Sequence, residues 1–90
     1  MMNQINPTIA RLDRVALRLG LSMREPGVNR REITLGGAEG RMLRYRPGGK
    51  GVVKVESVVP SIDGWKLDAV AFRTVEQMEE LFVKIAQKGL

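Results

Sequence analysis

Four segments of the chain alternate apolar and polar residues with the period of two that is typical of β-strands. They are rich in β-branched and aromatic residues and cover residues 31–35, 41–46, 52–59 and 65–72. Stretches rich in glycine and proline separate them at residues 36–40, 47–51 and 60–64, and each stretch is typical of a hairpin loop. The pattern therefore predicts a four-stranded antiparallel meander.

Helical periodicity replaces this alternation at both ends of the chain. Asn6 is a favourable N-cap residue, Pro7 suits the first helical position, and Gly20 predicts the end of the first helix. After the last strand, Thr74 and Gln77 have the spacing of a capping box. The apolar stripes that these helices would bury are Ile9, Leu12, Val15, Ala16 and Leu19, and then Val75, Met78, Leu81, Phe82 and Ile85.

The segment between the first helix and the first strand is expected to be a loop over residues 21–30, because Pro26 and Gly27 interrupt regular structure. The expected fold is α+β, with an N-terminal helix, a four-stranded antiparallel meander sheet and a C-terminal helix packed on one sheet face. With 90 residues the chain has room for one domain, which we expect to span residues 1–90.

Loop lengths also predict the register of the strands. They place three pairs opposite one another, namely Leu35 with Arg41, Arg46 with Val52, and Val59 with Trp65. One face then collects the apolar residues that the helices would cover: Ile33, Leu35, Leu43, Tyr45, Val53, Val55, Val59, Trp65, Leu67, Ala69 and Ala71. The opposite face collects Arg30, Glu32, Thr34, Met42, Arg44, Arg46, Val52, Lys54, Glu56, Val58, Lys66, Asp68, Val70 and Phe72.

This second face is mixed in character. In the predicted register Arg44 lies across from Lys54, and like charges directly opposite are unfavourable unless an anion sits between them. Phe72 stands beside these cations, with Val52 and Val70, as apolar and basic groups do at the centre of an interface. The alternative is that the C-terminal helix crosses to this face and covers Phe72.

The charge of the chain is divided unevenly. Fifteen Lys and Arg against ten Asp and Glu give a net charge of +5. Residues 1–54 hold eleven basic and four acidic groups, a net +7, whereas residues 55–90 hold four basic and six acidic groups, a net −2. A basic half indicates an acidic partner, although a GC-rich genome would also enrich arginine without a functional reason.

The first helix carries a second basic feature. Arg11, Arg14 and Arg18 share the side of this helix that faces away from its apolar stripe, at a spacing that aligns side chains along a helix. This stripe could bind phosphates, or it could simply be a solvated helix face.

Several kinds of chemistry are absent from the sequence. The chain has no cysteine and no histidine, which removes thiol catalysis and the commonest general base and metal ligand. The glycines of residues 36–40 and 47–51 match neither the dinucleotide nor the phosphate-loop pattern. We therefore expect no enzymatic activity, no cofactor and no metal. Without an apolar run or an N-terminal signal sequence, we expect a cytoplasmic protein with no membrane contact.

Residues 41–87, with three predicted strands and a helix opened by residues 72–77, are similar in outline to plant AP2-type and integrase arm-type DNA-binding domains. This resemblance implies that the sheet lies in the major groove and that the outward residues Arg44, Arg46, Lys54 and Lys66 meet DNA. The chain departs from the pattern in its extra helix and strand and in Glu56 and Asp68, which a groove-facing sheet would disfavour.

Two hypotheses follow from these observations. The first is a non-enzymatic nucleic-acid-binding protein, accessory or regulatory, that contacts the phosphates of DNA or RNA. The second is a protein-interaction module, such as a phage- or mobile-element-type inhibitor or adaptor, that binds an acidic protein, with homodimerisation as a special case. In either case the candidate binding residues are Arg11, Arg14, Arg18, Arg30, Arg44, Arg46, Lys50, Lys54, Lys66 and Phe72.

Overall fold

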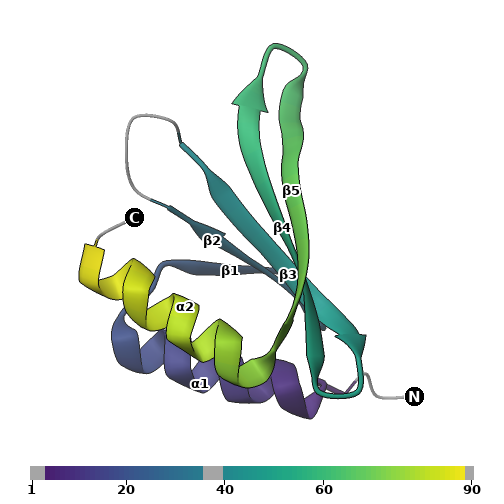
Figure 1. Ribbon diagram of the computed structural model, residues 1–90, viewed down its shortest axis with the longest axis vertical. Coiled ribbons are helices and arrows are strands. Elements are labelled where there is room, and N and C mark those ends of the chain that lie inside the picture. Colours follow the sequence, from purple (N-terminus) through teal and green to yellow (C-terminus); the bar gives the residue numbers. More distant parts are fainter. Residues whose placement is uncertain (1–3, 36–39, 89–90) are drawn as a thin grey trace.

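The computed structural model describes residues 4–35 and 40–88, which form two helices and one antiparallel sheet (Figure 1). In chain order the elements are α1 (Pro7–Leu19), β1 (Met23–Gly27), β2 (Arg30–Thr34), β3 (Met42–Gly49), β4 (Val52–Ser61), β5 (Gly64–Thr74) and α2 (Val75–Lys88). The strands pair in the order β1-β2-β3-β4-β5, so the sheet is a meander. Within these ranges neither helix is long and apolar enough to span a membrane.

The prediction of four strands was wrong, because the described residues form five. The additional strand, β1, lies in the segment that Pro26 and Gly27 indicated to be a loop. It pairs with β2 through Arg24 and Glu32, and its register shifts before Gly27. Strand β1 is an edge strand, so Pro26 can lack an N–H group without leaving a gap in the interior of the sheet.

The predicted caps, at both ends of α1 and at the start of α2, are confirmed. The side chain of Asn6 accepts a hydrogen bond from the backbone N–H of Thr8 at 2.9 Å, and Gly20 ends α1 in the left-handed conformation with φ of 72°. At the start of α2, the backbone N–H of Gln77 donates to the Thr74 hydroxyl at 3.1 Å, and the Thr74 N–H donates to the Gln77 side chain at 2.9 Å. This reciprocal pair is the capping box that the sequence predicted.

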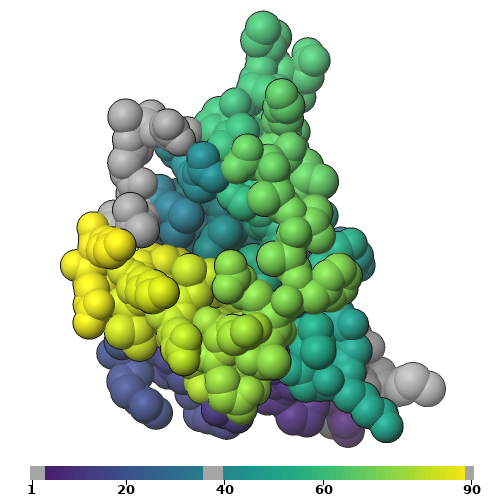
Figure 2. All heavy atoms as spheres, viewed as in Figure 1, coloured from purple at the N-terminus to yellow at the C-terminus, as the bar shows by residue number. Residues whose placement is uncertain are grey.

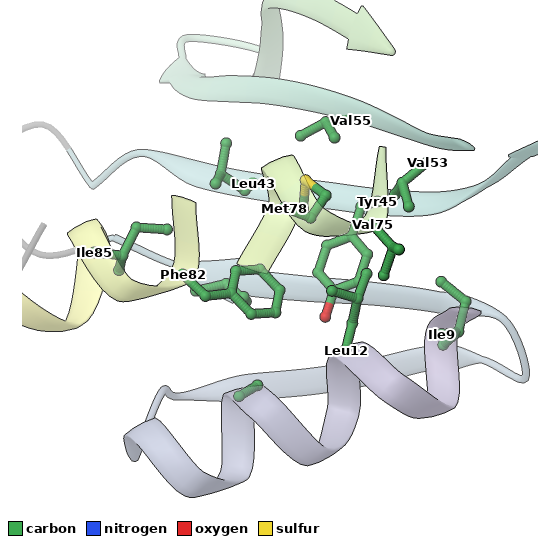
Figure 3. Close-up of a cluster of buried hydrophobic side chains, with 12 residues drawn as sticks. Ile9, Leu12, Leu43, Tyr45, Val53, Val55, Val75, Met78, Phe82 and Ile85 are labelled. Carbon is green, nitrogen blue, oxygen red and sulfur yellow. The ribbon is translucent and has the colours of Figure 1, made fainter. Parts of the chain in front are cut away.

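Both helices lie on one side of the sheet, which we call the inner face (Figure 1). Figure 3 shows the core between the helices and the sheet, with Tyr45 on β3 beside Phe82 on α2. The centroids of these two rings are 5.6 Å apart. The buried residues of this core are Ile9, Leu12, Ala16, Ile33, Leu43, Tyr45, Val53, Val55, Val75, Met78, Phe82 and Ile85. The other face, called the outer face here, is therefore not covered by α2.

Two of the three predicted registers differ from the structure. The pairing of Leu35 with Arg41 is supported by a 2.8 Å hydrogen bond from the Leu35 N–H to the Arg41 carbonyl. Arg46, however, pairs with Lys54 rather than Val52. The reason is that β3 continues to Gly49, so that only residues 50 and 51 turn the chain, and Gly48 forms an extra position between the Pro47–Val53 and Gly49–Val52 pairs.

At the far end of the sheet, β4 and β5 continue beyond β3 as a projecting hairpin, which we call the arm (residues 59–67; Figures 1 and 2). Trp65 pairs with Pro60 rather than Val59, because the loop is shorter than predicted and the pairing of β4 with β5 extends to Ser61 and Gly64. Strand β5 also has one residue more than β4 at Asp68. All residues from 60 to 70 are exposed.

These shifts reverse the faces predicted for four residues of β5. Trp65 and Leu67 pair with Pro60 and Val58, which alternate with the inward residues of β4, so both lie on the outer face. Their expected burial in the core was wrong, since they are 52% and 49% exposed.

Lys66 and Asp68 move in the opposite direction, from the predicted outer face to the inner side. Lys66 pairs with Val59, an inward position of β4. The Asp68 carboxylate accepts a 2.7 Å hydrogen bond from Arg41, whose guanidinium also donates to the hydroxyl of the inward Ser57 at 3.2 Å.

One arginine of the basic half is part of the folded interior. Arg31 is 2% exposed, and its guanidinium donates to both carboxylate oxygens of Asp13 on α1 at 2.9 and 3.0 Å. Its remaining terminal nitrogen donates to the carbonyls of Gly27, Val28 and Arg30 at 2.8–3.0 Å. The hydrogen bonds to Asp13 raise the pKa of Arg31. This side chain therefore fastens the β1–β2 turn to α1.

Another ion pair joins α1 to α2. Arg11 on α1 donates to both carboxylate oxygens of Glu79 on α2 at 2.8 and 2.7 Å, and it lies 3.5 Å from the carboxylate of Glu76. The hydrogen bond to Glu79 raises the pKa of Arg11. Arg11 thus has two carboxylate neighbours before any ligand is considered.

Candidate functional site

Three cations lie side by side across the outer face. Arg46 on β3 pairs with Lys54 on β4. Arg30 on β2 occupies the neighbouring position on the other side, next to the pair formed by Arg31 and Tyr45. We call Arg30, Arg46 and Lys54 the cation row. Among the residues that the structure describes, none of the three forms an ion pair with a carboxylate.

The adjacent row on the same face has balanced charge. It runs from Arg24 through Glu32 and Arg44 to Glu56. Arg24 donates to Glu32 at 2.7 Å, and Arg44 donates to Glu56 at 3.4 Å. The predicted juxtaposition of Arg44 with Lys54 was therefore wrong, because Arg44 lies between two carboxylates. Glu32 lies on the outer face, as predicted, and pairs with Arg44.

A pocket of about 300 Å³ opens between these two rows. Its lining contains four arginines, two glutamates, a proline and a tyrosine: Pro26, Arg30, Arg31, Glu32, Arg44, Tyr45, Arg46 and Glu56. The Nε atom of Arg44 is buried and has no hydrogen-bond partner among the described residues. An unpaired buried donor is costly, so a ligand atom that accepts a hydrogen bond from it would be favoured.

Phe72 lies at the β5 end of the cation row, opposite Lys54. It is 61% exposed, so the alternative in which α2 covers this face was wrong. Gly48 permits its position, because a Cβ there would lie 3.2 Å from the Phe72 ring and 3.0 Å from the backbone nitrogen of Lys54. The ring is therefore supported on one side by the β3 backbone and remains open to solvent.

The outer face becomes apolar toward the arm. Met42 pairs with Val58, and Val58 pairs with Leu67. Met42 and Val58 are 3% and 1% exposed, and they do not belong to the core cluster packed against the helices. Trp65 follows at the next outward position of β5. The outer face thus changes from cationic near the β3–β4 turn to apolar and aromatic near the arm.

The other predicted binding residues lie elsewhere. Arg14 and Arg18 are exposed on α1, in the helical layer on the inner side of the sheet. Lys50 is exposed in the β3–β4 turn, and Lys66 is exposed on the inner side of the arm. The structure therefore brings together Arg30, Arg44, Arg46, Lys54 and Phe72, and it separates them from the arginine stripe of α1.

Sequence reasoning missed Trp65 as a residue of this face and did not anticipate the pocket. The Asp63–Gly64 dipeptide favours a tight hairpin, and Gly64 adopts a φ of 114°. That signal would have favoured a shorter loop than residues 60–64 and so a different register. The pocket depends on the irregular pairing of β1 near Pro26, for which the sequence carries no comparable signal.

Comparisons with known proteins give no family. A scan of protein-family models, a search of curated proteins and a search of solved structures each find no match to this chain. The described residues also contain no cluster of three or more acidic side chains placed to hold a metal ion.

Proposed function

We propose that this protein is a small, non-enzymatic nucleic-acid-binding protein that holds phosphates on the outer face of its sheet. The observation that carries the proposal is the cation row. Arg30, Arg46 and Lys54 occupy neighbouring positions on three strands, and no carboxylate among the described residues compensates them. Like charges at directly opposed positions destabilise a sheet by tenths of a kcal/mol unless an anion lies between them.

The neighbouring row supports this assignment by contrast. There the glutamates Glu32 and Glu56 alternate with the arginines, so that row has no net charge. The excess positive charge of the face is therefore local. A phosphate at the pocket could accept hydrogen bonds from Arg30 and Arg46, whose planar guanidinium groups suit its oxygens. The free Nε–H of Arg44 supplies a further donor beside them.

The test is the salt dependence of binding to a labelled oligonucleotide. The variant Arg46→Gln with Lys54→Gln removes two cations of the row. We expect it to bind more weakly and to reduce the slope of log K against log salt by about 1.4, or about 0.7 per lost contact to a single strand.

The matched control is Lys84→Gln with Lys88→Gln, which removes the same charge from exposed positions of α2. We expect its slope to stay near that of the wild type. An unchanged slope in the Arg46 and Lys54 variant, or no binding by the wild type at low salt, would contradict the proposal.

One observation favours protein binding as a second candidate function. The arm exposes apolar side chains, including Ile62, which is fully exposed, and Leu67. An acidic protein could contact these residues and the cation row together. Light scattering tests the homodimer, which would have twice the monomer mass of 10.0 kDa. For another protein, the expected result is a complex that Leu67→Ser disrupts and an oligonucleotide does not displace.

A further inference from the structure

We infer that the ligand of the outer face is a single strand of nucleic acid whose bases stack on Phe72 and Trp65. This inference rests on the proposed function and adds to it the class of nucleic acid. It follows from the distribution of charged and aromatic groups on the face.

The outer face is divided into two sides. The cation row lies on β2, β3 and β4, whereas the outward residues of β5 are uncharged. The apolar residues among them are Trp65, Leu67, Val70 and Phe72, and these are between 45% and 61% exposed. The face therefore offers a cationic side for phosphates and, next to it, an apolar strip.

Two aromatic side chains lie at the ends of this strip. Phe72 is held against the backbone at Gly48 and lies opposite Lys54, so a base on its ring would have its phosphate near a cation. Trp65 lies on the same face of the same strand, seven positions away. At the rise of a β-strand this is about 20 Å, a span that several nucleotides would bridge.

The groups on this face suit a single strand better than a duplex. In a duplex the faces of the bases are stacked on one another, and only the edges of the bases are accessible, in the grooves between the phosphates. A duplex over this face would therefore offer no base face to the exposed rings of Phe72 and Trp65. A single strand presents both kinds of group, since its bases can turn to aromatic side chains while its phosphates meet the cations.

The test uses the fluorescence of Trp65, the only tryptophan of the chain. The probes are oligo(dT), oligo(rU), a mixed-sequence duplex and an abasic strand, each about 12 nucleotides long, within the range of single-strand sites. We expect both base-containing single strands, or one of them, to quench Trp65 emission and to bind at least tenfold more tightly than the duplex and the abasic strand.

Two variants separate stacking from general apolar contact. Phe72→Leu keeps an apolar side chain without an aromatic ring, and Trp65→Ala removes the second platform. Each should weaken binding of the single strand by about tenfold and leave binding of the abasic strand unchanged. The control is Val83→Ala, at an exposed position of α2, which should change neither.

Each other outcome overturns the inference in a distinguishable way. Equal, salt-dependent binding of all four probes, with no quenching, would leave phosphate binding by the cation row intact and exclude base stacking. Preferential binding of the duplex would have the same meaning. Failure of every probe to bind at low salt would overturn the inference together with the proposed function.

Discussion

The buried Arg31 of the inner face and the cation row of the outer face lie in the same sheet but in opposite electrostatic environments. On the inner face the buried Arg31 has both carboxylate oxygens of Asp13 and three backbone carbonyls as partners. On the outer face Arg30 and Arg46 form no ion pair among the described residues. The difference shows that net charge alone is a poor guide to binding, because part of the basic half of the chain is neutralised by the fold itself.

Sequence neighbours make this comparison most direct. Arg30 and Arg31 are adjacent in β2, and the alternation of a strand sends their side chains to opposite faces. Phe72 and Phe82 are not neighbours in the sequence, but they allow the same comparison, since Phe72 is exposed on the outer face and Phe82 is buried between α2 and the sheet. Substitutions at these pairs can therefore break the comparison between the two faces.

The largest expected effect is on the phenylalanines. Phe82→Ala should lower the free energy of unfolding by about 3–5 kcal/mol, because it leaves a cavity beside Tyr45 in the core. Phe72→Ala, the same substitution at a position that is 61% exposed, should change it by less than about 1 kcal/mol. Denaturant unfolding measures both. Equal losses would show that the outer face is as much a part of the core as the inner one.

The next effect is on the arginines. Arg31→Gln removes the partner of Asp13 and leaves carbonyls of the β1–β2 turn without donors, so it should cost about 3 kcal/mol of stability. Arg30→Gln should cost less than about 0.5 kcal/mol and should weaken oligonucleotide binding instead. The comparison fails if Arg30→Gln destabilises the protein as much as Arg31→Gln does, or if binding is insensitive to it.

The smallest effect is a pH dependence on the inner face. Burial raises the pKa of the Tyr45 phenol above its ordinary value of about 10. The unfolded chain therefore loses this proton at a lower pH than the folded protein does. The contribution of Tyr45 to stability is complete below about pH 10 and falls above it, by at most about 1.4 kcal/mol per pH unit.

Tyr45 is the only tyrosine, so Tyr45→Phe removes this dependence and leaves the lysines and arginines in place. Denaturant unfolding between pH 9 and 11, a range around the ordinary tyrosine pKa of about 10, should give a flatter curve for the variant than for the wild type. Parallel curves for the two proteins would show that the phenol of Tyr45 is accessible to water in the folded state.

Local signals in the sequence predicted the helices well. The caps at Asn6 and Thr74 depend on hydrogen bonds between residues two or three positions apart, and the apolar stripes follow from helical geometry. The meander, and the side of the sheet on which Arg30, Arg46, Lys54 and Phe72 lie, could also be predicted, because alternation along each strand identifies its faces.

Two features of the sheet were not predicted. The extra residues at Gly48 and Asp68 shift the register, and a shift of one position moves Trp65 from one face to the other. Strand β1 contains Pro26 and is possible because it lies at the edge of the sheet, a property of the assembled fold. The pocket and the balanced charge around Arg44 depend on these features.

We propose that ligands bind to the outer face rather than to the basic surface of the protein in general. This proposal is tested most directly by comparing two variants of equal charge, Arg46→Gln with Lys54→Gln on the outer face and Arg14→Gln with Arg18→Gln on α1. The measurement is the slope of log K against log salt for the tighter-binding of oligo(dT) and oligo(rU). We expect a slope reduced by about 1.4 for the first variant and a slope near that of the wild type for the second. A reduction for the α1 variant alone, or an equal reduction for both, would contradict it.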